Sequence, residues 1–285
     1  MMPEFIAEIS SNHHNDLNRC LKFIDTAAET GCGAVKFQLF KIDELFAPEV
    51  VRKRPDLQAR RKWELSPAFL PHLAKRCKQR NIKFSCTPFY LKAVDELEPF
   101  VEFFKIASYE LLWNDLLAAC ARTGKPVILS TGMATLKEVR KSVQTLQNSG
   151  CEDITLLHCT SFYPALPQNC NLAAINTLRK IPRCGIGWSD HSVSPAVIYR
   201  AIHRWGATTI EFHLDLEGEG EEYSGGHCWL PHEIKPVIDT VKMGFSADGS
   251  GEKKPDSCEI NEREWRADPS DGLRPLIKTR DTFKD

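Results

Sequence analysis

The sequence predicts an α/β protein folded as a (β/α)8 TIM barrel, in which eight parallel strands alternate with eight helices. Eight short apolar runs recur along the chain, and segments with a helical period of apolar residues separate them. Eight such units in about 250 residues match the size of this barrel. An open doubly wound sheet is the alternative, but no Gly-x-Gly-x-x-Gly motif follows the first apolar run.

The apolar runs have the length and the continuous apolar character of strands that are buried on both faces of a parallel sheet. They occupy residues 4–10, 34–40, 82–89, 103–108, 126–132, 154–160, 184–190 and 209–215. Each run is therefore expected to be one strand of the barrel.

Helix signals follow the first and the fifth of these runs. Apolar residues within 17–28 recur at helical spacing, and Gly31 follows them as the expected C-cap. Further along, Thr135 and Glu138 form the sequence pattern of a capping box, and Gly150 ends the helix that begins there. Strand and helix signals thus alternate in the order that a barrel requires.

Bulk composition excludes several classes of protein. The chain has 285 residues with 37 basic and 38 acidic side chains, so neither nucleic acid nor a membrane is an expected partner. The start lacks the pattern of a signal peptide, and no apolar run approaches the ~20 residues that span a bilayer. Eleven cysteines without a Cys-x-x-Cys pair indicate a reducing, cytoplasmic setting rather than disulfides or structural zinc.

Two segments fall outside the barrel pattern. Residues 41–81 contain a charged run, which is expected to be a solvated excursion after the second strand, with a substrate lid as the alternative. After residue 245 the composition becomes polar and rich in Gly and Pro. We therefore expect a single barrel domain at 1–245, followed by an irregular C-terminal tail at 246–285 that packs on or near the barrel.

Polar side chains gather at the carboxyl ends of the predicted strands, where barrel enzymes place their active sites. The candidate site residues are Glu8, Lys36, Gln38, Thr87, Lys105, Ser108, Glu110, Ser130, Ser161, Tyr163, Ser189, His191 and His213. Polar groups at this density in otherwise apolar strands indicate a catalytic or binding pocket.

Lys36 and Lys105 lie inside apolar strands, and a buried lysine is costly unless it is paired. A single buried lysine can be explained by an ion pair in the core. Two of them, near the hydroxyl groups of Ser108, Ser130 and Ser189, indicate a pocket for an anion with several oxygens, such as a phosphate or a carboxylate.

His191 and His213 end adjacent predicted strands, so their imidazoles are expected to converge. Two neutral imidazoles suit a divalent transition metal and leave coordination positions open for water or a substrate oxygen. For His158, upstream of a strand end, a buried hydrogen-bonded role fits equally well. The histidines expected at the surface or in packing are His72, His203, His227 and His232.

Glu110 is a lone carboxylate just past the fourth strand. It is either a helix-capping acid or a general acid/base beside a carbonyl that a metal polarises. Glu8, on the first strand, is expected to position substrate hydroxyls or to take part in proton transfer.

The motifs at these strand ends resemble those of the sialic acid synthase family. They read IAEISSNHHND, AVKFQLF, FSCTPF, FKIASYE, VILSTGM, LLHCTSFYP, IGWSDHS and EFHL, and they follow one another over roughly residues 4–245. Enzymes of this family condense phosphoenolpyruvate with an amino sugar to give a nine-carbon 2-keto-3-deoxy acid. The resemblance implies the same barrel fold and a divalent metal, Mn2+ or Mg2+.

The resemblance also implies roles for individual residues. His191 and His213 match the two metal-binding histidines of the family, and Glu110 matches the acid beside the metal and the sugar aldehyde. Glu8, an acid of the first-strand motif, and Lys36 are expected to join Glu110 as catalytic residues. The positions that match those around phosphoenolpyruvate are Lys36, Gln38, Thr87, Lys105, Ser108, Ser130, Ser161, Tyr163 and Ser189. At Ser161 the family often has Asn.

Two departures from the family concern the sugar. Typical members carry a C-terminal antifreeze-like domain whose arginine reaches a partner's active site, and this sequence is expected to be a short form without it. The candidates for a substitute arginine are Arg263, Arg266 and Arg274. The acid that the family commonly has eleven residues after the last histidine is Ser224 here. Glu221 or Glu222 is expected either to take over its role or to be merely solvated.

The expected function is metal-dependent condensation of phosphoenolpyruvate with an N-acetylmannosamine-like aldehyde, which forms a nonulosonic acid and releases phosphate. The same chemistry on another acceptor sugar is one alternative. A non-catalytic barrel that binds a sugar acid or phosphate is another. Family members are usually dimers, so a homodimer is compatible with the resemblance.

Overall fold

A closed barrel of eight parallel strands forms the centre of the computed structural model, which describes residues 2–283. Each strand pairs with the next, and β1 also pairs with β8, which closes the sheet. The strands are β1 (Glu4–Glu8), β2 (Ala34–Leu39), β3 (Lys83–Pro88), β4 (Phe103–Ile106), β5 (Val127–Ser130), β6 (Ile154–His158), β7 (Cys184–Asp190) and β8 (Thr209–Leu214). The predicted strands and the (β/α)8 TIM barrel are confirmed.

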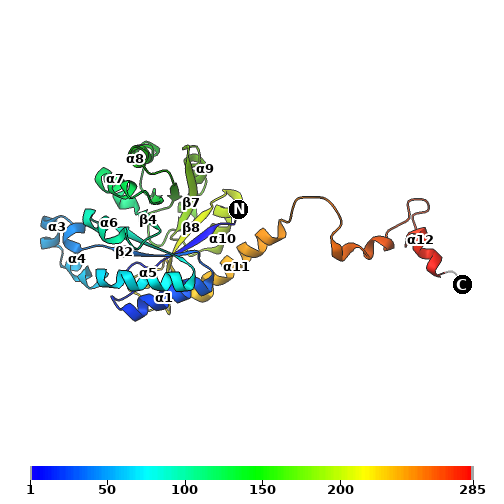
Figure 1. Cartoon of the computed structure of the whole chain (residues 1–285), viewed down its shortest axis with the longest axis horizontal. Helices are drawn as coiled ribbons and strands as arrows, with labels where there is room; N and C mark the ends of the chain where they lie inside the picture. Colours follow the sequence, from blue (N-terminus) through cyan, green and yellow to red (C-terminus); the bar gives the residue numbers. More distant parts are fainter. Residues whose placement is uncertain (1, 284–285) are drawn as a thin grey trace. The chain divides into compact units, whose positions relative to one another are not determined.

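Helices follow the strands and surround the sheet (Figure 1). They are α1 (Leu17–Thr30), α5 (Leu70–Arg80), α6 (Leu91–Leu97), α7 (Asn114–Arg122), α8 (Leu136–Asn148), α9 (Ala174–Leu178), α10 (Pro195–Tyr199) and α11 (Pro231–Ala247). Gly31 ends α1 in the left-handed conformation, with φ of 95°, and Thr135 and Glu138 form the predicted capping box of α8.

The inward-facing side chains change from apolar to polar along the barrel. Ile6, Ala34, Phe103, Ile128 and Leu157 pack together as one buried cluster. Side chains of a strand alternate between its two faces, so the residue two positions further on faces the same way. Those positions hold Glu8, Lys36, Lys105, Ser130 and Cys159. The barrel thus has an apolar floor and a polar top at the carboxyl ends of its strands.

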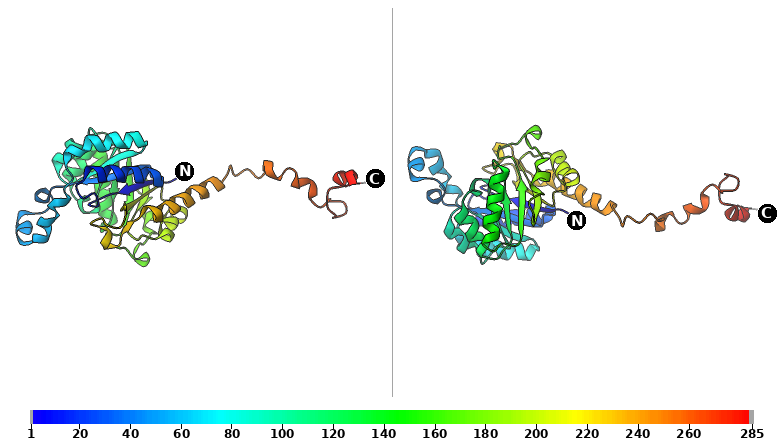
Figure 2. Two further views of the ribbon diagram at one scale, coloured as in Figure 1. Left: turned by 90° about the horizontal axis from the view of Figure 1, so that it is seen from below. Right: turned by 90° about the horizontal axis from the view of Figure 1, so that it is seen from above.

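The excursion after β2 is a set of short helices that projects from the barrel (Figure 2). It comprises α2 (Ile42–Leu45), α3 (Pro48–Lys53), α4 (Pro55–Ala59) and η1 (Arg60–Trp63). Phe40, Ile42 and Val51 form a small core of its own, against which Phe46 and Trp63 pack. The charged run of this excursion is mostly exposed, as expected of a solvated excursion, while its apolar side chains form this small core.

Contacts within the chain divide it into two units, and the boundary lies between Met243 and Gly244. The second unit holds the short helices η7 (Ser257–Glu259), η8 (Glu262–Trp265), α12 (Ile277–Arg280) and η9 (Asp281–Phe283). Polar contacts hold it together: the Glu264 carboxylate accepts hydrogen bonds from Lys278 and Thr279. The expected packing of a tail on the barrel stays a prediction.

Across residues 2–283, none of the helices combines the length and the apolar character that crossing a bilayer requires.

Gly187 in β7 offers a test of how closely the barrel strands pack. A Cβ atom at this position would lie 2.3 Å from the Thr209 carbonyl oxygen and 2.5 Å from Leu157 Cδ2. Gly187→Ala is expected to destabilise the fold by about 1–3 kcal/mol, because the clash includes backbone of the neighbouring strand. Urea unfolding followed by circular dichroism measures the change.

Gly185→Ala is the matched control, because Gly185 lies in the same strand and a Cβ there would contact only the side chain of Thr155. That side chain can rotate away, so a smaller loss of stability is expected. Equal losses in the two variants would contradict the proposed backbone clash.

Candidate active site

A cavity of about 750 Å³ opens at the carboxyl ends of the strands and brings most of the predicted site residues together. The predicted residues that line it are Glu8, Lys36, Gln38, Lys105, Ser108, Glu110, Ser130, Tyr163, Ser189, His191 and His213. Thr87 and Ser161 do not line it. Thr87 is buried behind Lys36 and accepts a hydrogen bond from its ammonium group at 3.0 Å. Ser161 lies beside Gly132.

The two buried lysines are each paired with a carboxylate. Lys36 forms an ion pair with Glu8, and Lys105 Nζ lies 3.3 Å from Glu211 Oε1. Burial lowers the pKa of Lys36 to about 8, because the charged form loses its hydration, although Glu211 opposes this change. Gln38 donates a hydrogen bond to Glu8 at 3.1 Å.

Glu211 is a site residue that the sequence reasoning missed. It accepts a hydrogen bond from Ser189 at 3.1 Å and lines the cavity. Burial alone would raise the pKa of Glu211, but Lys105 and Lys36 hold it below its usual range. The available signal was its place in β8, two residues before His213 and therefore on the same inward face.

Several polar atoms of the cavity wall have no partner within residues 2–283. Ser130 Oγ and Glu110 Oε2 are buried without a hydrogen bond. Ser108 Oγ, in contrast, accepts a hydrogen bond from the Gly132 amide at 3.0 Å. Buried polar groups without partners are uncommon in folded proteins, so these atoms are candidates for contact with a ligand.

Glu110 can exchange a proton near neutral pH. It lies at the end of η3 (Ser108–Glu110) and is almost completely buried. Burial raises the pKa of Glu110 to about 7, although Lys105 opposes this change. A carboxyl group with such a pKa suits general acid/base catalysis.

His191 and His213 do converge, with ring centroids 5.4 Å apart. His191 Nδ1 lies 2.8 Å from the carbonyl oxygen of Thr160, which can only accept, so this nitrogen carries the proton and Nε2 keeps its lone pair. Burial lowers the pKa of His191 to about 3 and also lowers that of His213. Both rings are therefore neutral near pH 7, as metal binding requires.

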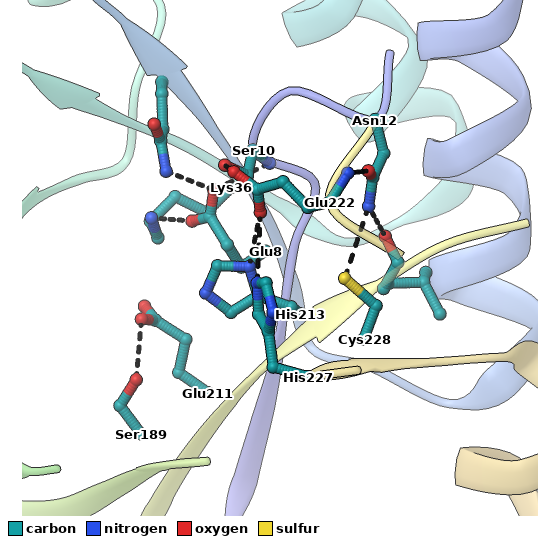
Figure 3. A network of polar contacts seen from close by, with 12 residues as sticks. Glu8, Ser10, Asn12, Lys36, Ser189, Glu211, His213, Glu222, His227 and Cys228 are labelled. Atoms are coloured by element: carbon teal, nitrogen blue, oxygen red, sulfur yellow. Dashed lines mark hydrogen bonds and ion pairs between the residues drawn. The ribbon is translucent and has the colours of Figure 1, made fainter. Parts of the chain in front are cut away.

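Glu222 and His227 complete this cluster, as the close-up in Figure 3 shows. Glu222 Oε2 lies 3.0 Å from His213 Nδ1 and 3.4 Å from His227 Nε2. The prediction that His227 lies at the surface or serves only packing is wrong, because this residue lines the cavity with 7% of its surface exposed. Glu221, in contrast, points outward and forms an ion pair with Lys62.

A short strand explains why His227 reaches the site. β9 (Cys228–Trp229) pairs with β8, and Cys228 lies opposite His213 in the register. His227 directly precedes this strand, so the pairing brings its ring to within 4.7 Å of the His213 ring. The signal in the sequence was the apolar run Cys-Trp-Leu after two glycines, which the sequence reasoning did not treat as a strand.

The donor set fits a divalent cation. Ligand atoms of His213, Glu222, His227 and Cys228 all lie within 4.8 Å of one another. Neutral imidazoles with a carboxylate are typical ligands of Mn2+, Fe2+, Co2+ and Zn2+. His191 is not part of this group of four, but its ring centroid lies 5.4 Å from that of His213 and the Thr160 carbonyl leaves its Nε2 lone pair available.

The excursion after β2 contributes Leu45, Phe46, Leu57 and Arg60 to the cavity wall. The Arg60 guanidinium stacks on Trp63 at 5.1 Å, and its Nε is buried without a hydrogen-bond partner among the described residues. Arg60 was not predicted as a site residue. The arginines that were predicted, in the segment 263–274, belong to the second unit and stay a prediction.

Fold and cavity together define a class of protein: a (β/α)8 barrel whose strand ends carry paired lysines beside a cluster of imidazoles and carboxylates. The chain belongs to the NeuB family, the family of the sialic acid synthases, which matches residues 23–253. Synthases of this family are phosphoenolpyruvate-dependent condensing enzymes.

Individual relatives support this assignment. The chain is 36% identical over 257 residues to an uncharacterized protein of Methanocaldococcus jannaschii. The alignment covers 89% of this chain and 74% of that protein. It is 34% identical to the N,N'-diacetyllegionaminic acid synthase of Campylobacter jejuni, over 89% of this chain and 80% of that protein. The crystal structure of an N-acetylneuraminic acid synthetase from Leptospira borgpetersenii superposes with a TM-score of 0.81 at 30% identity, covering 95% and 93% of the two chains.

Glu110 gives a prediction about stability and pH. Its pKa is raised from 4.5 to about 7 in the folded state, so folding favours the protonated form. The stability that this form contributes is present below pH 4.5 and is lost as the pH rises toward and through 7. Relative to the natural protein, Glu110→Gln is therefore expected to gain up to about 3 kcal/mol between pH 4.5 and pH 8.

Urea unfolding at both pH values measures this difference. Glu152→Gln, at an exposed carboxylate in a loop, is the control and is expected to show no such gain. A constant offset between Glu110→Gln and the natural protein across this range would contradict the raised pKa.

Proposed function

We propose that the protein condenses phosphoenolpyruvate with the open-chain aldehyde of an amino sugar of the N-acetylmannosamine type, in a metal-dependent reaction that gives a nonulosonic acid and phosphate. The observation that carries this proposal is a single cavity in which two buried lysines lie with serine hydroxyls and a cluster of neutral imidazoles. The first group suits a multiply charged anion, and the second suits a divalent cation.

The lysine half of the cavity would bind phosphoenolpyruvate. Lys36 and Lys105 supply two ammonium groups, and the partnerless Ser130 hydroxyl can donate to an anionic oxygen. Lys36 is paired with Glu8 and Lys105 with Glu211, so neither ammonium group is buried without an opposite charge beside it. The remaining members proposed for this half are Gln38, Thr87, Ser108, Ser161, Tyr163 and Ser189.

The imidazole half would hold the metal through His191 and His213, and a divalent ion there would polarise the sugar carbonyl as a Lewis acid. Imidazole ligands favour Mn2+ over Mg2+, because Mg2+ prefers an all-oxygen shell. Arg60 lies in the part of the cavity wall that the excursion after β2 provides. Its Nε, which has no hydrogen-bond partner among the described residues, would donate to an acyl or anionic oxygen of the acceptor sugar.

In the proposed reaction a C–C bond and a C–O bond form, and the bond from C2 to the phosphate-bearing oxygen breaks. C3 of phosphoenolpyruvate bonds to the aldehyde carbon, and Glu110, with a pKa of about 7, gives a proton to the aldehyde oxygen. Water then adds at C2 and loses a proton to the ionised Glu110. The bond from C2 to the phosphate-bearing oxygen breaks, and phosphate leaves with the remaining hydroxyl proton. Glu8 and Lys36, which share an ion pair, hold the anion in line for attack.

The setting that we propose is the cytoplasm, because all eleven cysteines are free and ten of them are at least partly buried, as in proteins of reducing compartments. The homodimer stays a prediction. Neither nucleic acid nor a membrane is proposed as a partner, in line with the balanced charge of the sequence.

Phosphate release from phosphoenolpyruvate with Mn2+ tests the proposal. The acceptors are N-acetylmannosamine, its 6-phosphate and the diamino sugars that lead to legionaminic and pseudaminic acids. Release is expected to depend on one of these sugars and to stop when a chelator removes the metal. His191→Ala is expected to lower the rate by at least about 100-fold, since the metal loses a ligand, with an unchanged circular dichroism spectrum.

His232→Ala is the matched control, because His232 is exposed and lies outside the cavity. Its activity is expected to equal that of the natural protein. Binding of phosphoenolpyruvate without release in the presence of any of these sugars would favour the alternative of a non-catalytic binding barrel.

A further inference from the structure

We propose that Glu222 and His227 are themselves ligands of the divalent ion, so that four side chains of this chain, His191, His213, Glu222 and His227, hold the metal. This inference rests on the proposed function in one respect only, the presence of a metal in the cavity. It selects Glu222 over Glu221 as the acid near the histidines, where the family's acid falls at Ser224 here, and it adds His227, which the sequence analysis placed at the surface or in packing.

The spacing of the donor atoms supports a shared ion. Two ligand atoms that bind one metal at about 2.1 Å, with angles of about 90–110° between the bonds, lie about 3.0–3.4 Å apart. Glu222 Oε2 lies 3.0 Å from His213 Nδ1 and 3.4 Å from His227 Nε2. The carboxylate oxygen therefore already has the separation of a neighbouring ligand from each imidazole nitrogen, and ligand atoms of the two rings lie within 4.8 Å of each other.

Glu222 is a partly buried carboxylate without a basic side chain as its partner. Among residues 2–283, no lysine or arginine forms an ion pair with it, and its partners of that kind are the imidazoles of His213 and His227. Its side chain is 21% exposed. A divalent ion that takes the place of the protons shared with the two rings would supply the missing positive charge.

The surrounding contacts hold Glu222 in the orientation that a ligand needs. Ser10 Oγ donates to Oε1, which leaves Oε2 to face the imidazoles (Figure 3). The Glu222 amide donates to Asn12 Oδ1 at 2.8 Å, and Asn12 Nδ2 donates to the Leu214 carbonyl at 3.0 Å. Asn12 thus ties the loop that carries Glu222 to the end of β8, as outer-shell partners of metal ligands do.

The His227 ring has one nitrogen toward Glu222 and the other buried beside Gly225. Its Nδ1 is buried and has no hydrogen-bond partner in the described part of the chain. A Cβ atom on Gly225 would lie 2.9 Å from this nitrogen, so the ring occupies space that only glycine leaves free. Because Nε2 faces Glu222, the ring is oriented toward the cluster.

Cys228 is close to the other donors but is not a ligand in this proposal. Its sulfur accepts a hydrogen bond from Asn12 Nδ2 at 3.6 Å, and a metal-binding cysteine would have to be a thiolate. The set of three imidazoles and one carboxylate leaves positions open on a six-coordinate ion for a sugar oxygen and water.

Metal binding by the full chain, without substrates, tests the proposal. Co2+ is titrated into chelator-treated protein and followed by its visible absorption, and the affinity is measured by calorimetry. Glu222→Gln and His227→Gln are each expected to weaken Co2+ binding by at least about tenfold. The matched controls, Glu221→Gln and His232→Gln, are expected to bind Co2+ as the natural protein does, because both residues lie outside the cluster.

A count of bound imidazoles provides a second, independent readout. Pulsed electron paramagnetic resonance of the Mn2+ form, with 15N-labelled histidine, is expected to detect three directly bound nitrogens, and two after His227→Gln. Two nitrogens in the natural protein would overturn the assignment of His227. Because this measurement uses the natural chain, it stays decisive even where a variant fails to fold.

The outcomes separate this inference from the proposed function. Unchanged Co2+ affinity in both Glu222→Gln and His227→Gln would overturn the four-ligand site, whereas sugar-dependent, chelator-sensitive phosphate release would leave the condensation standing. A natural protein that binds neither Co2+ nor Mn2+ would overturn the four-ligand site as well. Phosphate release that is insensitive to chelator would then also remove the metal from the proposed reaction.

Discussion

The cost of burying charge at the top of an apolar barrel is the constraint on which this site depends. Charged groups that leave water must be paired, and the structure pairs them across neighbouring strands. Lys36 on β2 pairs with Glu8 on β1, and Lys105 on β4 lies against Glu211 on β8. These pairs hold charge of both signs in the cavity before any substrate arrives, and an anionic ligand can exchange places with the carboxylates.

The closure of the sheet makes such pairs available. Because β1 pairs with both β2 and β8, Glu8 lies level with Lys36 on one side and with His213 on the other. The lysine pairs and the imidazole cluster are therefore adjacent within one ring of strands. Glu110, in the same cavity, is buried strongly enough for its pKa to rise to about 7. The lysine pairs, the imidazole cluster and Glu110 thus line a single cavity.

Segments outside the eight strand-and-helix units complete the cavity. The excursion after β2 closes part of its wall with apolar side chains and Arg60, and its Lys62 forms an ion pair with Glu221. The adjacent Glu222 turns inward to His213 and His227. The loop that carries these two neighbouring glutamates therefore contacts the excursion through Glu221 and the histidine cluster through Glu222.

The sequence by itself determined the barrel, its eight strands and many polar residues of the cavity, because the period of two in each strand places Glu8, Lys36, Lys105 and His213 on the inward face. Only the tertiary structure decided that Glu222 and His227 lie beside His213. Loop residues carry no period from which their direction follows, and Glu221 and Glu222 are equivalent in the sequence. The pairing of β9 with β8 and the contacts of Asn12 decide which carboxylate lies against the histidines.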